Sequence, residues 1–370
     1  MTRTPIVFFF GGVSSEHEVS CLTAAGVLSA LDETRFEAYG VGIDRQGCWH
    51  RYTAAEIRAL KVNDGAFPSV DASGRAALLY RGTNGEVTLA TIDGDTLRDK
   101  VRVEVAFPLL HGPFGEDGTI QGYFEMLGLR YVGAGVAASA LGIDKHLSKL
   151  AFEAAGLQVA PYIWFTARDW ANDAASLSAR ASALGYPLYV KPARGGSSVG
   201  ITRVTREDAL EAAVAVALEH DPKVVIEAGF VNAREVECGV MGGRHGGPVR
   251  VTRPAEIVMH VKDGFYDFEA KYVSDSQAEL QVPADLSAEI EARVCEAAAA
   301  AFTALGGEGL SRVDSFVLPD GTVALNEANT LPGFTQISMF PRTWMETGLS
   351  YSEIISDLID QALERPLGLR

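Results

Sequence analysis

Cysteine and histidine are scarce in this chain of 370 residues and are not arranged for cross-linking or metal binding. The four cysteines, Cys21, Cys48, Cys238 and Cys295, are far apart and include no C-x-x-C pair. So few cysteines exclude a disulfide framework, and we expect reduced, mostly buried thiols. The seven histidines show no H-x-x-x-H or His/Cys spacing, which argues against a zinc site.

Long apolar segments are also missing. No stretch reaches the roughly 20 apolar residues needed to span a bilayer. The apolar run at residues 6–10 is stopped by Gly11-Gly12 and is too short for the hydrophobic part of a signal peptide. We therefore expect a cytoplasmic protein without membrane contact.

Positive charge is in deficit, with 32 Lys and Arg against 48 Asp and Glu and a formal net charge of -16. A nucleic-acid partner needs clustered cations, and the chain has no dense basic run, so we expect no such partner. An acidic protein that binds a polyphosphate must place a few Lys or Arg side chains locally, together with a divalent cation. Hydrophobic residues make up 47% of the chain, enough for a core, and the length predicts two or three domains.

The N-terminal residues read as strand, glycine loop, helix and strand. Residues 5–10 and 36–43 have the apolar content of buried strands, and residues 19–31 have helical periodicity. Ser15 and Glu18 fit a capping box ahead of that helix, so a βαβ unit with parallel strands is predicted. Further strands are expected at residues 76–80, 86–92, 103–110, 188–192, 224–227 and 235–241, and helices at 144–155, 207–219, 287–305 and 352–364.

A hairpin near the C-terminus gathers polar side chains on one face. Asp320-Gly321 between alternating runs is a strong turn signal, and a two-residue turn would place Asp314 opposite Glu327 and Arg312 opposite Asn329. Facing carboxylates repel unless a cation lies between them. Oxygen ligands of this kind suit Mg²⁺ or Mn²⁺, and the alternative is a solvated face on which Arg312 neutralises both acids.

Two glycine-rich segments could approach an anion. Residues 191–200 follow a strand with Lys191 leading into Gly195-Gly196-Ser197-Ser198, which is typical of a phosphate-covering loop but is not a Walker A loop. Residues 11–16 turn into a helix N-terminus, another anion site. The alternative for residues 191–200 is a flexible hairpin tip without a ligand. The alternative for residues 11–16 is an ordinary connection from a strand to a helix. His111 ends a buried strand at a glycine-rich loop, where ligand sites of open α/β sheets occur.

A long polar connection at residues 262–285 carries three charged and three aromatic side chains at 266–272. Long loops inside compact domains are often functional lids, and the alternative is a surface loop.

Together these strings resemble the D-alanine–D-alanine ligases of the ATP-grasp superfamily, in family order over residues 5–341. The strings are Gly11-Gly12 with Ser15-Glu16 to Ser20, His111-Gly112 with Gly115-Glu116-Asp117-Gly118, Asp144-Lys145, Lys191-Pro192 to Gly200, Glu269-Ala270-Lys271-Tyr272, Arg312-Val313-Asp314, and Asn326-Glu327-Ala328-Asn329-Thr330 with Pro332-Gly333.

The resemblance implies an α/β (α+β) fold, with a Rossmann-like N-terminal domain followed by a two-part ATP-grasp fold. It implies domains at residues 1–143, 144–242 and 243–370 and a homodimer. It also implies the reaction: ATP phosphorylates one D-alanine, and the amino group of a second attacks the acyl phosphate to give D-alanyl-D-alanine for peptidoglycan precursors.

The resemblance assigns roles to individual residues. ATP phosphates would be bound by Lys145 and Lys191, adenine and ribose by Glu227 and Glu235, and two Mg²⁺ or Mn²⁺ ions by Asp314, Glu327 and Asn329. Glu16 would hold the ammonium of the first D-alanine near His111, Arg312 and the Gly333 amide would stabilise the oxyanion, and Lys271 and Ser338 would bind the second substrate's carboxylate or the phosphate. Ser197 and Tyr272 would be linked to Glu16 by hydrogen bonds.

Three alternatives stay open at this point. A variant ligase on the same scaffold could make a depsipeptide such as D-alanyl-D-lactate, although Tyr272 resembles the residue of dipeptide makers. A biotin-dependent carboxylase-type ATP-grasp enzyme is disfavoured by the Glu16 loop and the Lys271-Tyr272 pair. A nucleotide-binding protein without catalysis is disfavoured because a dead site need not keep a costly cluster of like charges.

Overall fold

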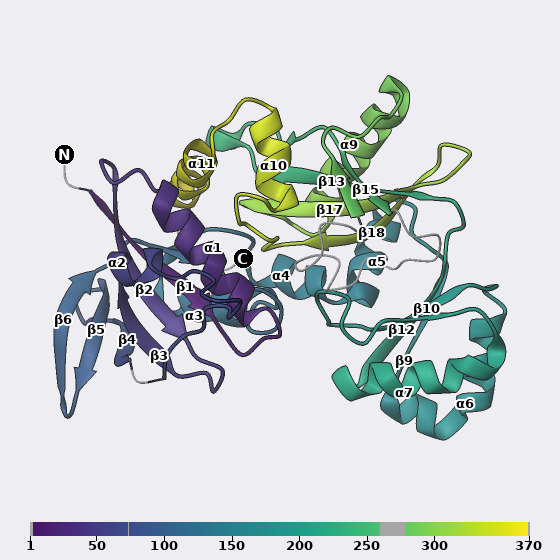
Figure 1. Cartoon of the computed structure of the whole chain (residues 1–370), viewed down its shortest axis with the longest axis horizontal. Coiled ribbons are helices and arrows are strands. Elements are labelled where there is room, and N and C mark those ends of the chain that lie inside the picture. Colours follow the sequence, from purple (N-terminus) through teal and green to yellow (C-terminus); the bar gives the residue numbers. More distant parts are fainter. Residues whose placement is uncertain (1–2, 73, 260–277, 369–370) are drawn as a thin grey trace.

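The computed structural model describes residues 3–72, 74–259 and 278–368. These residues form a mixed α/β structure with three sheets, drawn in Figure 1 with the first sheet at the left, the second at the lower right and the third above and between them. Among the described residues, no helix is both long and apolar enough to cross a membrane.

The first sheet has eight strands in the order β6-β5-β4-β3-β2-β1-β7-β8. Strands β2 and β7 both run parallel to β1, which confirms the predicted βαβ unit. The strands are β1 (Thr4–Gly11), β2 (Phe36–Ile43), β3 (Trp49–Thr53), β4 (Arg75–Arg81), β5 (Val87–Asp93), β6 (Thr96–Arg102), β7 (Val105–Pro108) and β8 (Arg130–Tyr131), and the helices are α1 (His17–Ala30), α2 (Ala54–Arg58) and α3 (Thr119–Leu127).

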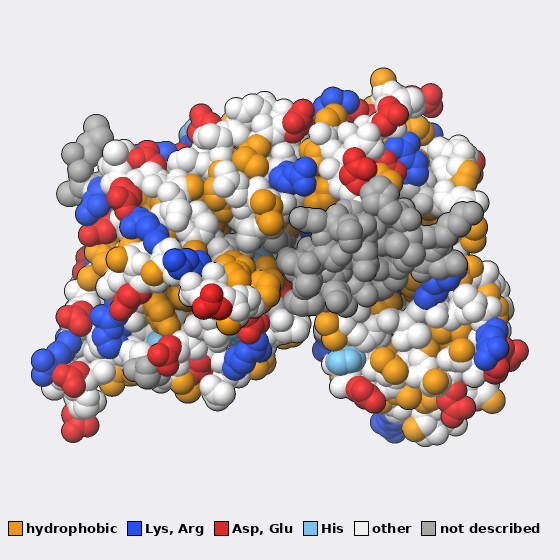
Figure 2. Space-filling model, in the orientation of Figure 1, with side chains coloured by type: hydrophobic (Ala, Val, Ile, Leu, Met, Phe, Trp, Pro, Cys, Tyr) orange, Lys and Arg blue, Asp and Glu red, His pale blue; other side chains and the backbone are white. Residues whose placement is uncertain are grey.

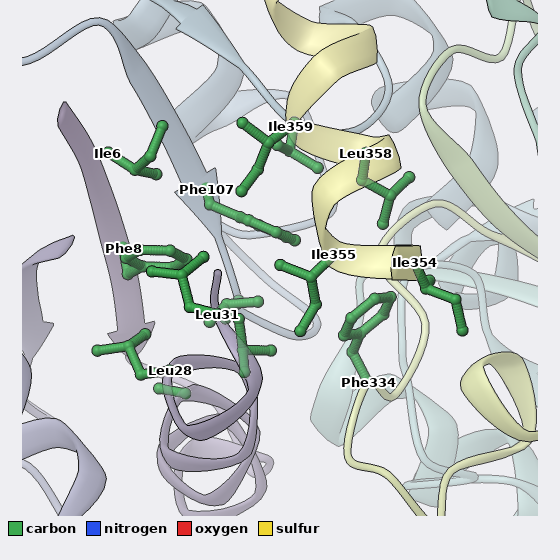
Figure 3. Close-up of a cluster of buried hydrophobic side chains, with 14 of the residues drawn as sticks. Ile6, Phe8, Leu28, Leu31, Phe107, Phe334, Ile354, Ile355, Leu358 and Ile359 are labelled. Atoms are coloured by element: carbon green, nitrogen blue, oxygen red, sulfur yellow. The ribbon is translucent and has the colours of Figure 1, made fainter. Parts of the chain in front are cut away.

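Both faces of the first sheet are buried around β1, which explains the unbroken apolar run in this strand. Ile6 and Phe8 pack on the side of α1 and the C-terminal helix α11 (Tyr351–Glu364), whereas Val7 and Phe9 pack on the side of α3. Figure 3 shows Phe107 of β7 between the β1 side chains Ile6 and Phe8 and the α11 side chains Ile355 and Ile359. The C-terminal helix α11 therefore completes the hydrophobic core of the N-terminal sheet.

The second sheet has four strands in the order β11-β10-β12-β9 and is covered on one face by two helices. The strands are β9 (Tyr162–Thr166), β10 (Leu188–Pro192), β11 (Thr202–Val204) and β12 (Lys223–Ala228), and the helices are α6 (Ala167–Ser182), the short 3₁₀ turn η1 (Glu207–Ala209) and α7 (Leu210–His220).

The third sheet follows the order β16-β15-β13-β17-β18, with β14 paired to β13. Helix α9 packs on one of its faces. The strands are β13 (Arg234–Met241), β14 (Arg250–Val251), β15 (Ala255–Met259), β16 (Ala278–Gln281), β17 (Leu310–Val317) and β18 (Val323–Asn329), and the helices are α4 (Val136–Ile143), α5 (Lys145–Ala154), η2 (Arg244–Gly246), α9 (Ala288–Ala304) and α10 (Met339–Glu346). The expected division of the chain at 143 and 242 stays a prediction, and β13 is hydrogen-bonded into this third sheet.

The hairpin β17–β18 has the predicted register near the polar face but a different turn. Pro319, Asp320 and Gly321 form a three-residue loop closed by Leu318 and Thr322, with Gly321 at φ 82°, a conformation that glycine adopts without strain. The predicted two-residue turn was therefore wrong. A bulge beside Asp314 absorbs the one-residue difference and restores the pairs Arg312–Asn329 and Asp314–Glu327.

The predicted capping box of the first helix was also wrong. Helix α1 begins at His17 with Glu16 at the N-cap, and no side chain caps it. Glu18, the acid of the predicted box, instead pairs with Arg45, 27 residues away. A tertiary partner thus replaces the local one that the spacing indicated.

Charged side chains of both signs are interspersed on the face shown in Figure 2, and no broad patch of Lys and Arg gathers there. This mixture agrees with the charge balance of the sequence.

Candidate active site

The second and third sheets turn their polar faces toward one cavity. Along β10, Leu188 and Val190 are buried under the helices, so Tyr189 and Lys191 point the other way. Along β13, Val236 and Cys238 pack against α9, which leaves the alternate positions for the opposite face. The period of two in these strands therefore selects which side chains reach the site.

The cavity between the two sheets has a volume of ≈ 160 Å³, and we call it the larger cavity. It brings together seven of the predicted site residues. Its lining includes Lys145, Lys191, Ser197, Glu227, Glu235, Asp314 and Glu327, together with Tyr189, Phe230, Phe316, Glu237 and Asn326.

Glu227 lies at the end of β12 between two lysines. Lys149 Nζ is 2.9 Å from Glu227 Oε2, and Lys191 pairs with the other carboxylate oxygen. Burial alone would raise the pKa of Glu227, but the two ammonium groups outweigh it and lower the pKa to about 2. Burial lowers the pKa of Lys149, and the charge of Glu227 opposes that shift.

The predicted polar face of the hairpin is assembled as an ion cluster. Arg312 donates from Nε to Asp314 Oδ1 at 2.8 Å and from Nη2 to Asp314 Oδ2 at 2.7 Å, and its Nε lies 3.1 Å from Glu237 Oε2. Asn329 Nδ2 donates to Asp314 Oδ2 at 3.1 Å. The four predicted residues are therefore on one face, with Glu237 as a fifth member contributed by β13.

Lys145 and Glu327 connect the larger cavity to a second, smaller one of ≈ 20 Å³. Lys145 Nζ lies 3.2 Å from Glu327 Oε2 and donates to the Gly195 carbonyl at 2.9 Å. Asp144 caps the helix that carries Lys145 by accepting from the backbone N–H groups of His146 and Leu147, as predicted. The smaller cavity is lined by Gly112, Glu116, Gly142, Ile143, Gly195, Gly196, Ala328, Asn329 and Thr330 in addition to those two residues.

Glu16 lies beside the smaller cavity and is joined to the glycine-rich loop. Ser197 donates from Oγ to Glu16 Oε1 at 2.5 Å. Ser197 and Ser198 have φ of 49° and 59°, a left-handed conformation that non-glycine residues rarely adopt. The loop is anchored next to these serines by Arg194, which donates to the buried Asp221 from its backbone N–H and its guanidinium. A strained loop held at both ends is typical of a functional site.

Glu116 is a further acid in the smaller cavity. Its Oε2 accepts from the Gly112 N–H at 2.8 Å, and its Oε1 accepts from the Leu331 N–H at 3.0 Å. Burial is the largest cause that raises the pKa of Glu116 to about 8, and the charge of Glu16 adds to it. Three carboxylates, those of Glu16, Glu116 and Glu327, thus influence one another around a small space.

His111, Gly333 and Ser338 lie on the segment that follows the hairpin or against it. His111 is buried and its Nδ1 donates to the Leu331 carbonyl at 3.0 Å, so the proton is on Nδ1. A Cβ placed on Gly333 would lie 3.2 Å from Ser338 Oγ, and Ser338 also shares a 2.7 Å hydrogen bond with Thr335. The structure therefore brings Gly333 and Ser338 together.

Lys271 and Tyr272 lie outside the described residues, as does most of the predicted loop at 262–285. Its described end was wrongly expected to be irregular, because strand β16 pairs there with β15. The assignments of Lys271 and Tyr272 stay predictions.

Three residues of the site were missed in the sequence. Lys149 is four residues after Lys145 on the same helix face, and Glu237 is two residues after Glu235 on the same strand face, so both could have been found from periodicity. Glu116 belongs to one of the strings that carry the resemblance, but its role could not be found, because its partner Leu331 is 215 residues away.

The metal assignment has a suitable donor set. Asp314 and Glu327 face each other on adjacent strands with Asn329 beside them, and carboxylate and amide oxygens are what hard divalent cations prefer. Within residues 3–72, 74–259 and 278–368, no group of three or more His, Cys, Asp or Glu side chains is arranged to hold a metal ion, so any ion would rely on the amide and on its other ligands.

Known proteins match the chain over almost its whole length. Models described as the D-ala D-ala ligase N-terminus and C-terminus match residues 5–134 and 151–360. D-alanine–D-alanine ligase of Arthrobacter sp. (strain FB24) is 50% identical over 366 residues, with 99% of this chain and 95% of the relative covered. The ligase of Paenarthrobacter aurescens (strain TC1) is 48% identical over 370 residues, with 100% and 97% covered.

Two solved structures share the fold. The VanG D-Ala:D-Ser ligase from Enterococcus faecalis superposes with a TM-score of 0.83 at 35% identity and covers 98% of this chain and 100% of its own. The D-alanine–D-alanine ligase from Coxiella burnetii gives a TM-score of 0.82 at 29% identity, with 99% and 95% covered. These matches confirm the predicted α/β fold of the ATP-grasp type, and with the family models and the relatives they establish that the chain belongs to the D-alanine–D-alanine ligase family.

Proposed function

We propose that the protein ligates two D-alanine molecules to D-alanyl-D-alanine at the expense of ATP, as a step in the supply of peptidoglycan precursors. The observation that carries the proposal is the pair of neighbouring cavities, both of which are lined by Lys145, Gly195 and Glu327. Such a pair suits a reaction in which a phosphoryl group passes from a nucleotide in one cavity to a small acid in the other.

The larger cavity would hold ATP. Lys191 and Lys145 supply positive charge for the phosphates, and Glu227 and Glu235 would accept from adenine and ribose. Asp314, Glu327 and Asn329 would hold two Mg²⁺ or Mn²⁺ ions, which when bound neutralise charge on the transferred phosphoryl group. Arg312, fixed by Asp314 and Glu237 at distances of 2.7–3.1 Å, is preorganised to stabilise a developing oxyanion.

The first D-alanine would bind at the smaller cavity beside Glu16, and because ≈ 20 Å³ holds about one water molecule, the cavity would have to widen to admit it. The Glu16 carboxylate is placed to pair with its ammonium group, and Ser197 holds that carboxylate in position. His111 would face the same substrate, and the Gly333 N–H would donate to the oxyanion. Ser338, beside Gly333, would bind the second substrate, and Lys271 and Tyr272 complete the proposed set.

The test is ADP release by the full-length protein with ATP, Mg²⁺ and D-alanine, with the product identified by its mass. L-alanine replaces D-alanine in one arm, and D-lactate is added in another. D-alanine-dependent ADP release with a dipeptide mass would confirm the proposal. A depsipeptide mass would assign the chain to the variant ligases, and no ADP in any arm would refute the ligase activity.

D-serine is a second candidate for the second substrate, because the structurally similar VanG protein is described as a D-Ala:D-Ser ligase. A competition of D-alanine with D-serine at equal concentration separates the two. We expect the D-alanyl-D-alanine mass to dominate, since the relatives with the higher identities of 48–50% are D-alanine–D-alanine ligases.

Ser197→Ala should reduce kcat/KM for D-alanine by about 10- to 100-fold, because a hydrogen bond to a charged group contributes about 1.5–3 kcal/mol. Ser197→Gly removes the same hydroxyl but relieves the positive φ, which costs a side-chain-bearing residue about 1 kcal/mol. We therefore expect both variants to lose kcat/KM to the same extent. The glycine variant should unfold at a higher temperature than the alanine variant. Activity restored by glycine would show that backbone strain, and not the hydroxyl, was limiting.

We also propose a cytoplasmic homodimer, on the basis of the family resemblance and the use of ATP. Sedimentation velocity at micromolar concentration should give a mass twice the 39.5 kDa of one chain. A species of single-chain mass across the concentration range would refute the dimer.

A further inference from the structure

The backbone of Leu331 is held on both sides by one loop of the N-terminal sheet. Its N–H donates to Glu116 Oε1 at 3.0 Å, and its carbonyl accepts from His111 Nδ1 at 3.0 Å. The second oxygen of Glu116 accepts from the Gly112 N–H at 2.8 Å, which ties the same carboxyl group back to its own loop. Two segments more than 200 residues apart are therefore joined at a single residue.

Leu331 is the start of the segment that carries the proposed oxyanion donor. Pro332 and Gly333 follow it directly, and the segment is anchored again at Phe334, whose carbonyl accepts from the Tyr351 hydroxyl at 2.5 Å. The Leu331 and Phe334 side chains are buried in the core shared by α1 and α11, and Figure 3 shows Phe334 beside Ile354 and Ile355. Between these two anchors only the Pro332–Gly333 backbone is left to move.

We infer that Glu116 is a positioning residue for the ligation reaction: by clamping Leu331 to Gly112 it fixes where the Gly333 N–H points. This inference rests on the proposed function. Oxyanion donors act only when they are already aimed at the position where charge develops, and a shift of about 1 Å away from the reacting atoms can cost about 100-fold in rate. Loss of the clamp should therefore lower kcat without weakening the binding of ATP.

Asp117 provides a matched control in the same loop. Like Glu116 it accepts two backbone N–H groups, from Phe114 at 2.9 Å and from Thr119 at 2.9 Å, but both belong to its own loop. Glu116→Gln and Asp117→Asn thus make the same chemical change at adjacent residues. Only Glu116→Gln changes a side chain that accepts from Leu331, in the segment that follows β18.

The experiment compares the steady-state kinetics of wild type, Glu116→Gln, Glu116→Ala and Asp117→Asn. We expect kcat to fall about 100-fold in Glu116→Ala and less in Glu116→Gln, which keeps one acceptor oxygen, with KM for ATP unchanged within about twofold. Asp117→Asn should keep kcat. A kcat loss in Asp117→Asn as large as that in Glu116→Ala, or a loss confined to KM, would overturn the inference.

Hydrogen exchange gives a readout that does not depend on turnover. The peptide spanning residues 331–334 should exchange faster in Glu116→Ala than in wild type or in Asp117→Asn, because the Leu331 N–H loses its acceptor. Unchanged exchange there would refute the clamp even in an active enzyme. An inactive wild type that still shows the exchange difference would refute the proposed function while leaving the clamp intact.

Discussion

Glu327→Gln is expected to lower D-alanine-dependent ADP release by about 100- to 1,000-fold, the cost of removing one preorganised electrostatic group in other enzymes. Glu327 is the acid that lines both cavities, and it lies opposite Asp314 on the neighbouring strand. Glutamine keeps the shape of the side chain but removes the charge that would bind a divalent cation and pair with Lys145. The substitution therefore removes a charge at the place where the phosphoryl group would be transferred.

The control is Asp320→Asn at the tip of the same hairpin. It changes the net charge by the same amount, but Asp320 accepts only a local hydrogen bond from the Thr322 N–H. We expect activity within about twofold of wild type, because exposed residues away from a site rarely contribute.

The dependence of the rate on Mg²⁺ concentration tests whether Glu327 is a metal ligand. If Glu327 binds the ion, the Glu327→Gln variant should need more Mg²⁺ for half-maximal rate and should regain part of its activity at high concentration. Its stability should change little, since the side chain is 25% exposed. Activity like that of wild type would refute the metal assignment.

Glu227→Gln is expected to lower the free energy of unfolding by about 3–5 kcal/mol, the range found when one partner of a buried ion pair is removed. The carboxylate pairs with Lys149 and Lys191, and the Lys149 side chain is only 1% exposed. Without Glu227, two ammonium groups would remain close together with no counter-charge. A shift of the urea unfolding midpoint, followed by tryptophan fluorescence, measures the loss.

Two further variants bracket this prediction. Glu153→Gln, on the exposed side of the same helix α5, should change the free energy by no more than about 0.5 kcal/mol. Glu227→Gln combined with Lys149→Met should recover part of the loss, because an apolar side chain replaces the uncompensated buried charge. A single variant as stable as wild type would show that the pair is not buried in solution.

The pH dependence follows from the direction of the shift. The pKa of Glu227 is lowered from 4.5 to about 2 in the folded protein, so its stabilising contribution is complete above pH 4.5 and is lost as the pH falls toward 2. The stability difference between wild type and Glu227→Gln should therefore be constant near neutral pH and shrink below pH 4.5. A difference that grows as the pH falls would contradict the assignment.

Local periodicity was sufficient to place much of the site. The alternation of β10, β13 and β17 decided that Lys191, Glu235 and Asp314 share one side of their sheets, and the cap at Asp144 fixed the helix that presents Lys145. The pairs Arg312–Asn329 and Asp314–Glu327 of the hairpin were predicted correctly although its turn was not. A bulge that was not predicted compensates for the extra residue in the turn.

What the sequence by itself determined was the set of elements and the face on which each polar side chain lies, because these depend on neighbours within a few residues. Only the tertiary structure decided how those faces pair: Ser197 with Glu16, Lys149 with Glu227, and Glu116 and His111 with Leu331. Each of these contacts joins separate segments of the chain, and no spacing rule reaches that far. A buried charge or backbone N–H must find a partner once the chain is folded, and which partner it finds depends on how the three sheets pack together.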